Sequence, residues 1–345
     1  MSSRSMLITG GAGFIGVNAA DHFLKKGWTV TLFDNLSRQG TQKNLAWIQS
    51  VHGPPLRFIH GDVRDGPAIR EAVRGQDAVL HLAAQVAVTT SVSDPEPDFE
   101  VNARGTFNVL EAVRTAAPEA PLLFASTNKV YGGLEGWTLR KEGVRWLPDD
   151  GRRAVSETEP LDFHSPYGCS KGAADQYVHD YARCYGLRTV VFRQSCIYGA
   201  HQYGNEDQGW VAHFLHSVIR GAPLTIYGDG FQVRDLLDVR DLNRLYAHTL
   251  ERIGRAAGQV FNVGGGPDNA RSVIEVLHAI ESSLGTDARY DYAGWRQGDQ
   301  LFYVSDVGQA DRVLGWRPQI PFEAGLEHLV EWARAERAAA SAPAG

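Results

Sequence analysis

The sequence predicts an α/β fold: a doubly wound parallel (Rossmann) sheet with helices on both faces, followed by a smaller α/β C-terminal lobe. Three observations favour it. Short apolar strands alternate with amphipathic helices through the first 193 residues. A glycine-rich turn lies between the first strand and the first helix. Successive predicted strands end at Gly10, Asp34, Asp62, Ala83 and Ser126, which places these residues at the sheet edge where such folds bind ligands.

The first predicted strand, 6–9, runs into Gly10-Gly-Ala-Gly-Phe-Ile-Gly16, and an amphipathic helix follows to about residue 26. Glycines permit a tight turn, and they let backbone N–H groups approach a pyrophosphate. This loop is therefore predicted to bind a dinucleotide through Gly10, Gly13, Phe14, Ile15 and Gly16.

The second predicted strand, 29–33, ends at Asp34, about twenty residues after the glycines. A carboxylate there accepts hydrogen bonds from the ribose hydroxyls and repels a 2′-phosphate, which favours NAD over NADP. Arg38 leaves the choice open, because an arginine can pair with a 2′-phosphate or stack on adenine. We predict NAD, bound here by Asp34, Asn35, Ser37 and Arg38.

Further strands are predicted at 56–60, 78–82 and 122–125, with a long helix at about 99–116 between the last two. The third strand leads to residues expected near adenine, and the small residues after the fourth let backbone approach the cofactor. The expected contacts in this part of the chain are Asp62, Val63, Leu82, Ala83, Ala84 and Gln85.

Tyr167 and Lys171 lie four residues apart on a predicted helix, 167–185. They therefore project from one face, where the ammonium can favour the ionised phenol and make it a general base. Ser165 is expected to cap this helix and Pro166 to be its first residue. Taken alone, the spacing also fits a surface lysine beside a half-buried tyrosine.

The preceding stretch, 134–161, shows little periodicity and is predicted to be a loop near the active site. After a sixth strand at 189–192 the composition turns loop-rich and aromatic, and 260–263 is predicted to return to the main sheet. These features predict a cofactor domain of residues 1–193 with 235–265, a smaller lobe of 194–234 with 266–338, and a flexible tail at 339–345.

The charge balance argues against duplex nucleic acid as a partner, because 34 basic residues face 40 acidic ones and no basic cluster stands out. No run of about 18 apolar residues occurs, and the first strand begins too early for a signal peptide, so no membrane association is expected. Cys169, Cys184 and Cys196 lack metal-ligand spacing and fit a reducing cytoplasm. We expect a cytoplasmic protein without a metal.

Several motifs occur together: Thr9-Gly10-x-x-Gly13-x-x-Gly16, Asp34, Asp62, Ser126-Thr127, Tyr167-x-x-x-Lys171 and Arg234-Asp235. In combination they resemble the extended short-chain dehydrogenase/reductase family of nucleotide-sugar epimerases and dehydratases, over nearly the whole chain. Within that family, the chain is most similar to the CDP-paratose (CDP-tyvelose) 2-epimerases, in the strings at 34–38, 85–91, 126–132, 162–176 and 207–211.

The resemblance implies roles for three catalytic residues. Tyr167 takes the proton of a sugar hydroxyl as hydride leaves the same carbon for NAD, Lys171 holds the nicotinamide ribose and lowers the pKa of Tyr167, and Thr127 hydrogen-bonds the reacting oxygen. It also implies Gln194 as a cofactor contact. For a 2-epimerase it implies transient oxidation at C2 and reduction on the other face, with the NAD regenerated in each turnover.

Dehydration is not expected. Dehydratases of the family place Asp-Glu directly after the Ser/Thr, where this chain has Asn128 and Lys129. Lys129 is also compatible with a solvated loop lysine.

The resemblance also implies substrate contacts. Arg234 and Arg296 match positions that bind the diphosphate and suit bidentate contacts. Many relatives have an asparagine where this chain has Cys196, so phosphate binding must depend on those arginines and on backbone. A lone histidine such as His201 is more often structural. The expected substrate contacts are Val88, Thr127, Asn128, Cys196, His201, Gly209, Val211, Thr225, Tyr227, Arg234, Arg296 and Asp299.

The leading hypothesis is a nucleotide-sugar 2-epimerase acting on a CDP-hexose or deoxyhexose. A UDP-sugar 4-epimerase with the same catalytic trio is the alternative, and a non-catalytic NAD sensor is less favoured because all three groups are retained. Relatives pair through two helices, here 99–116 and 167–185, which implies a homodimer or tetramer.

Overall fold

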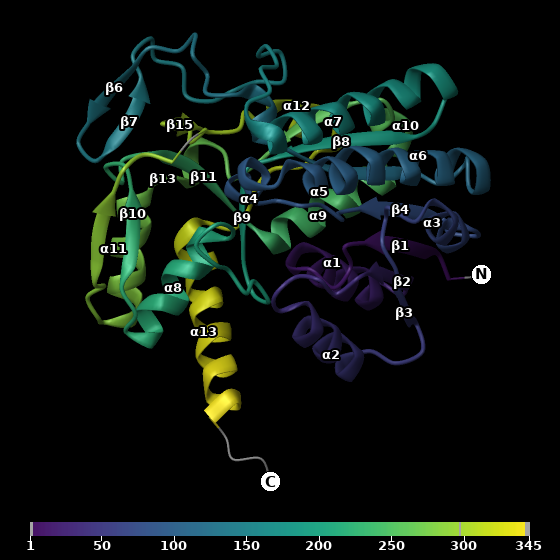
Figure 1. Cartoon of the computed structure of the whole chain (residues 1–345), viewed down its shortest axis with the longest axis horizontal. Helices are drawn as coiled ribbons and strands as arrows, with labels where there is room; N and C mark the ends of the chain where they lie inside the picture. Colours follow the sequence, from purple (N-terminus) through teal and green to yellow (C-terminus); the bar gives the residue numbers. More distant parts are fainter. Residues whose placement is uncertain (1–2, 297, 342–345) are drawn as a thin grey trace.

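A seven-stranded parallel sheet forms the centre of the molecule, which the computed structural model describes at residues 3–296 and 298–341 (Figure 1). The spatial order is β12-β8-β5-β4-β1-β2-β3. The strands are nearly continuous apolar runs because both faces of the sheet are covered. Their bounds are β1 Ser5–Thr9, β2 Thr29–Asp34, β3 Leu56–His60, β4 Ala78–His81, β5 Leu122–Thr127, β8 Thr189–Gln194 and β12 Val260–Val263. The predicted fold class is confirmed.

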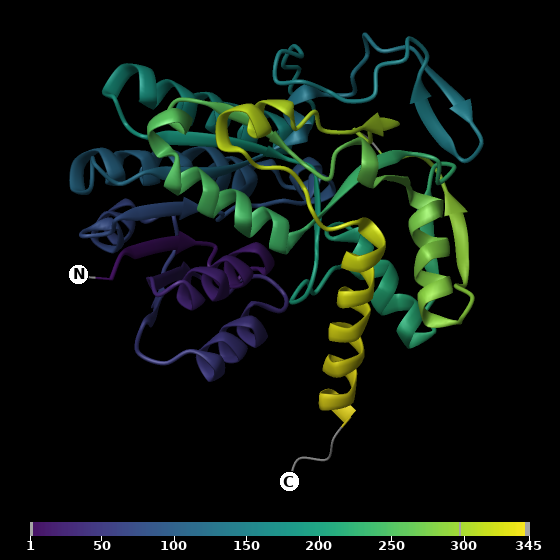
Figure 2. The same cartoon turned by 180° about the vertical axis from the view of Figure 1, so that it is seen from behind.

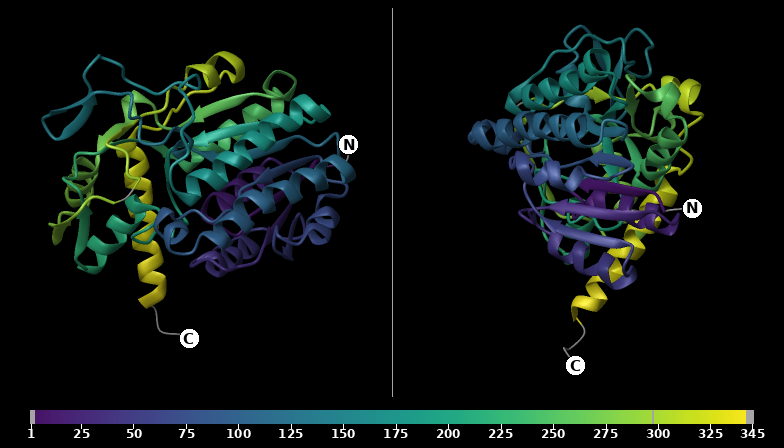
Figure 3. Two further views of the ribbon diagram at one scale, coloured as in Figure 1. Left: turned by 45° about the horizontal axis from the view of Figure 1, so that its top comes forward. Right: turned by 90° about the vertical axis from the view of Figure 1, so that its right-hand side faces the viewer.

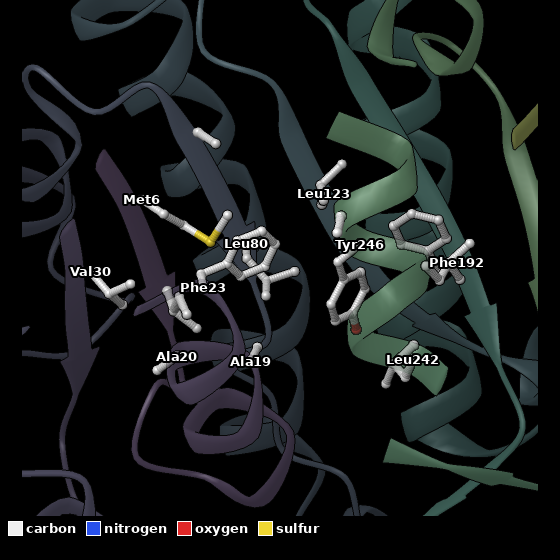
Figure 4. Close-up of a cluster of buried hydrophobic side chains, with 14 of the residues drawn as sticks. Met6, Ala19, Ala20, Phe23, Val30, Leu80, Leu123, Phe192, Leu242 and Tyr246 are labelled. Atoms are coloured by element: carbon white, nitrogen blue, oxygen red, sulfur yellow. The ribbon is translucent and has the colours of Figure 1, made fainter. Parts of the chain in front are cut away.

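Helices lie on both faces of this sheet (Figure 3). Side chains of β1 alternate between two buried clusters: Met6 and Ile8 belong to one, and Leu7 to the other. In the first cluster, Tyr246 packs on Phe192 with ring centroids 5.5 Å apart (Figure 4). This face carries α1 Phe14–Lys25, α2 Thr41–Val51 and α9 Val239–Glu251, and the other carries α3 Gly66–Val73, α6 Gly105–Ala116 and α7 Ser165–Tyr185.

The strand order reverses direction at β1, since β2 and β3 lie on one side of it and β4, β5 and β8 on the other. In open sheets of this kind, ligands bind outside the carboxyl ends of the strands at such a switch point.

The smaller lobe stands beyond these strand ends (Figures 1 and 2). A third buried cluster lies in this lobe and packs its strands against α8, α11 and α13. The helix bounds are α8 Trp210–Arg220, α11 Val273–Leu284 and α13 Phe322–Ser341. The strand bounds are β9 Cys196–Tyr198, β10 Leu224–Tyr227, β11 Val233–Asp238, β13 Ala270–Ser272, β14 Tyr290–Ala293 and β15 Phe302–Tyr303.

Two segments depart from the predicted division into domains. After α10 (Ile253–Ala256) and β12, the short helix α12 (Gly308–Leu314) packs in the first cluster of the central sheet, together with Trp316. The predicted tail begins inside α13, which continues to Ser341, while residues 342–345 lie outside the described residues.

The stretch 134–161 is not a plain loop, which corrects the prediction. It contains an antiparallel hairpin of β6 (Leu139–Glu142) and β7 (Arg145–Pro148). Its flanking Trp137 stacks on Phe302 of the smaller lobe with ring centroids 6.0 Å apart. The hairpin escaped detection because its apolar residues, Leu139, Trp146, Leu147 and Pro148, do not alternate with polar ones.

The predicted helix at 99–116 consists of the end of α5 (Pro95–Phe99), a π-helical turn, η1 (Glu100–Arg104), and α6. Helix α4 (Val88–Ser93) precedes these elements. Short 3-10 turns, η2 (Asn128–Tyr131) and η3 (Pro267–Asn269), complete the elements. No helix among the described residues is both long and apolar enough to cross a membrane.

Candidate active site

A cavity of about 680 Å³ opens at the carboxyl ends of the central strands. Every residue that the sequence assigned to the cofactor lines it: Gly10, Gly13, Phe14, Ile15, Gly16, Asp34, Asn35, Ser37, Arg38, Asp62, Val63, Leu82, Ala83, Ala84, Gln85, Tyr167, Lys171 and Gln194. The cavity continues to the smaller lobe, where it is lined by Cys196, His201, Gly209 and Val211.

The glycine loop lets backbone atoms come closer together than a side chain would allow. Gly10 has φ +64°, and a Cβ there would lie 2.8 Å from the Ala83 nitrogen. A Cβ on Gly16 would lie 2.5 Å from the Gly10 carbonyl oxygen. Helix α1 begins after Gly13 with no side chain capping it, so its first amides remain available to a pyrophosphate. The loop therefore fits a dinucleotide.

Asp34 is a fixed acceptor at the end of β2. Its Oδ2 accepts from the Ala12 amide at 3.0 Å and its Oδ1 from the Leu36 amide at 2.7 Å. Burial raises the pKa of Asp34, and these two hydrogen bonds oppose the rise. A carboxylate held in this way suits ribose hydroxyls and disfavours a 2′-phosphate.

Asp62 lies beside it at the end of β3. Its carboxylate accepts from the Asn35 amide at 2.8 Å and from the Arg64 guanidinium at 2.7 and 2.9 Å. Hydrogen bonding by Arg64 is the main reason why the pKa of Asp62 falls to about 2. Asp62 is therefore ionised at neutral pH.

Tyr167, Lys171 and Thr127 meet on one wall of the cavity. Burial raises the pKa of Tyr167, while a hydrogen bond with the Thr127 side chain and the charge of Arg38 oppose the rise. Lys171 Nζ donates to the Ala125 carbonyl at 2.6 Å, and burial lowers its pKa to about 7. Lys171 lies one turn further along the same helix, and its role toward Tyr167 stays a prediction.

Arg38 reaches across the cavity. Its guanidinium donates to the Gln208 side chain of the smaller lobe.

The start of α7 positions Tyr167. The helix begins at Ser165, one residue before the predicted start, and Ser165 has φ +65°. The residue before the helix is His164, whose side chain makes no capping hydrogen bond, so the predicted cap position is wrong, although the Gly168 amide does donate to Ser165 Oγ at 3.2 Å. The Tyr167 amide donates to Ser91 Oγ at 3.1 Å, which ties the helix to α4.

Sequence reasoning missed a buried polar network below this wall. Asp175 accepts from Arg193 and from Ser126 Oγ, and Arg193 also donates to the Tyr131 hydroxyl at 2.9 Å. The one available signal was the four-residue spacing between Lys171 and Asp175 on the helix.

The two arginines expected to bind phosphate lie outside the cavity lining. Arg234 is paired with Asp299 at 2.6 Å and also donates to the Gln300 carbonyl. Arg296 stacks on the ring of Tyr227 at 3.9 Å from its centroid and pairs with acidic residues 206 and 207 at 3.5 Å.

The other expected substrate contacts divide into two groups. Asn128 lines the cavity beside Thr127, whereas Val88 and Thr225 do not line it. His201 lines the cavity, and its ring stacks on Trp47 with ring centroids 3.7 Å apart. Burial lowers the pKa of His201 to about 4. A neutral, packed imidazole agrees with the structural interpretation of this residue.

Among the described residues, one group of side chains lies close enough together to share a metal ion: Glu135, Asp162 and His164. All three are exposed, and none lines the cavity.

Comparison with known proteins identifies the family. The profile of the NAD dependent epimerase/dehydratase family matches residues 6–264. The CDP-paratose 2-epimerase of Salmonella typhi is 40% identical over 334 residues, which cover 95% of this chain and 98% of that protein.

Two solved structures share the fold. The dTDP-glucose 4,6-dehydratase of Streptomyces venezuelae, solved with NAD bound, has a TM-score of 0.83 and 32% identity, covering 97% of this chain and 98% of that one. The UDP-glucose 4-epimerase of Thermus thermophilus, in complex with NAD, has a TM-score of 0.81 and 34% identity, covering 96% and 99%. This chain therefore belongs to the NAD dependent epimerase/dehydratase family, and its cofactor is NAD.

Proposed function

We propose that this protein is a nucleotide-sugar 2-epimerase that inverts C2 of a CDP-hexose or CDP-deoxyhexose. The observation that carries the proposal is the meeting of Thr127, Tyr167 and Lys171 on one wall of the cofactor cavity. The 40% identity to a CDP-paratose 2-epimerase, over nearly the full length of both chains, supports the choice of nucleotide and carbon.

The side chains of the chain handle the proton, while NAD, when bound in the cavity, would supply hydride transfer from and to the sugar carbon. Tyr167 takes the proton of the hydroxyl on that carbon and gives it back, and Thr127, already hydrogen-bonded to Tyr167, holds the reacting oxygen. Inversion follows when the ketone presents its other face before it is reduced.

A UDP-sugar 4-epimerase is the second candidate. A putative UDP-glucose 4-epimerase of Methanocaldococcus jannaschii is 30% identical over 95% of this chain. The catalytic trio suits either carbon, because oxidation and reduction need the same groups. Dehydratases are also relatives, but expulsion of water needs an acid and a base beside the sugar, and Asn128 and Lys129 follow Thr127 here.

We also propose that two copies pair through α5–α6 and α7. Exposed aromatic side chains on these helices support the pairing: Phe99 is 53% exposed, Tyr177 52% and Tyr185 55%. Analytical ultracentrifugation would show a dimer or a tetramer, and a monomer at micromolar concentration would contradict the proposed pairing.

We further propose a location in the reducing cytoplasm, which the three free cysteines support.

The test is NMR of the products formed by the purified protein from CDP-, UDP- and GDP-hexoses in deuterated water, without added cofactor. Inversion at C2 without deuterium incorporation is expected, because the hydride stays on bound NAD. Inversion at C4 would establish the second candidate instead. No conversion of any sugar would favour a non-catalytic NAD-binding role.

A further inference from the structure

Two cations share one carboxylate between the fifth strand and the smaller lobe. Arg234 Nη2 lies 2.6 Å from Asp299 Oδ1, and Lys129 Nζ lies 3.9 Å from the same oxygen. The side chains are largely shielded from solvent: Arg234 is 9% exposed, Lys129 21% and Asp299 25%. This cluster of Lys129, Arg234 and Asp299 therefore carries a surplus of one positive charge.

The groups next to the cluster do not remove that surplus. Asp235 adjoins Arg234 in sequence, but its carboxylate accepts from Ser195 and from the backbone of residues 266 and 305, and burial raises its pKa. The thiol of Cys196 lies close to both cations, and burial raises its pKa too, which keeps it neutral.

The ammonium of Lys129 has more N–H donors than hydrogen-bond acceptors around it. It donates to the Gly298 carbonyl at 3.0 Å, and its second partner is the distant Asp299 carboxylate. An ammonium has three hydrogens to donate. Burial and the charge of Arg234 lower the pKa of Lys129 to about 8, as expected where positive charge is in excess. A shielded surplus charge is costly unless an anion joins it.

The cluster adjoins the reacting groups. The Lys129 amide donates to Thr127 Oγ1 at 3.2 Å, so Lys129 stands two residues from the catalytic threonine on the turn that ends β5. Cys196, which faces the cluster, lines the cavity itself. Lys129 and Arg234 do not themselves line the cavity, but a substrate that reacts at Thr127 and extends past Cys196 comes near both cations.

We propose that Lys129 is a substrate-binding residue that holds the diphosphate of the nucleotide sugar together with Arg234, while Asp299 neutralises one of the two cations. This inference rests on the proposed function, since it takes the substrate to be a nucleoside diphosphate sugar. The diphosphate supplies the negative charge that the cluster lacks, and the free N–H of Lys129 donates to it.

Calorimetric titration of the NAD-loaded protein tests the proposal. Wild type is titrated with CDP, UDP and GDP, and the tightest of these is compared with its own nucleoside, which lacks phosphate. Lys129→Met is expected to weaken binding of the diphosphate by about 10-fold to 100-fold and to leave nucleoside binding unchanged. Lys129→Arg is expected to restore binding to within about threefold, because it keeps the charge.

The controls separate binding from folding. Lys25→Met removes an exposed lysine of α1, which is paired with Asp21, and is expected to bind like wild type. NAD content and melting temperature are measured for each variant. Wild-type affinity in Lys129→Met would overturn the inference alone, as would an equal loss of nucleoside and diphosphate. Failure of wild type to bind any of the three diphosphates would overturn the inference together with the proposed function.

Discussion

Arg193 donates two hydrogen bonds of 3.0 Å to the carboxylate of Asp175, a residue that lies one helical turn beyond Lys171 on α7. The two side chains are 5% and 0% exposed. Ser126 Oγ donates to the same carboxylate at 2.7 Å. The pair therefore joins α7 to β8 and β5, whose ends carry Gln194 and Thr127.

Removing one partner of this buried pair should be costly. Asp175→Ala leaves the Arg193 guanidinium without its carboxylate, and the free energy of unfolding is expected to fall by about 3–5 kcal/mol. Urea denaturation of the NAD-loaded protein measures it. Glu251→Ala is the matched control, because it breaks an ion pair with Arg252 that is 57% and 38% exposed, and it is expected to cost at most about 1 kcal/mol. Equal effects in the two variants would show that the buried pair is not an anchor of α7.

Tyr167 is predicted to be indispensable for turnover. Tyr167→Phe removes the hydroxyl that exchanges a proton with the sugar, and kcat is expected to fall by about 10²-fold to 10⁴-fold while bound NAD is retained. Tyr292→Phe on β14 changes a tyrosine that is 57% exposed and lies outside the cavity lining, and it should keep full activity. The assay is conversion of the nucleotide sugar under single-turnover conditions. Retained activity in Tyr167→Phe would remove the tyrosine from the mechanism.

Gly10, Asp34 and Asp62, which the sequence assigned to the cofactor, line the cavity because each lies at or just after the end of a strand. Gly10, Asp34 and Asp62 are marked by position alone: in a parallel sheet all carboxyl ends meet at one edge, so a linear pattern implies a cluster in space. The fold class followed from the same regularity.

The sequence could not predict contacts between distant segments. Arg193 and Asp175 pair across the sheet, and Arg234 is bound by Asp299, a residue 65 positions away. Nothing in local spacing marks such partners. The proximity of Arg38 to Tyr167, whose pKa its charge lowers, is of the same kind, because the fold brings their two segments together.

Gly16 tests the packing of α1 against the glycine loop. Its Cβ would lie 2.5 Å from the Gly10 oxygen and 2.7 Å from the Gly11 Cα, so Gly16→Ala must displace α1. We expect a loss of about 1–3 kcal/mol in stability and a lower NAD content in the purified protein, although alanine is the better helix former. In Gly254→Ala the new Cβ has no atom within 4 Å, so NAD content should not change. If purified Gly16→Ala keeps the NAD content of wild type, the close packing of Gly16 on the glycine loop is not needed for NAD binding.

His81 makes stability depend on pH. Its ring lies between Thr9 Oγ1 at 2.6 Å and Thr106 Oγ1 at 3.0 Å, and burial, aided by the charge of Lys171, lowers its pKa to about 3. In the unfolded chain the pKa of histidine is about 6.5. Between pH 6.5 and about 3 the unfolded chain therefore binds a proton that the folded chain does not, so stability falls as the pH is lowered.

The expected loss from His81 is about 2 kcal/mol at pH 5, since each pKa unit is worth about 1.4 kcal/mol. Urea denaturation at pH 7.5 and pH 5 measures it in wild type and in His81→Gln. The variant lacks the titrating ring, so the difference between its stabilities at the two pH values should be smaller than that of wild type by about 2 kcal/mol. His278→Gln, which removes an exposed ring on α11, is the control. If that variant loses pH dependence equally, or His81→Gln retains all of it, the buried ring is not the group that couples folding to pH.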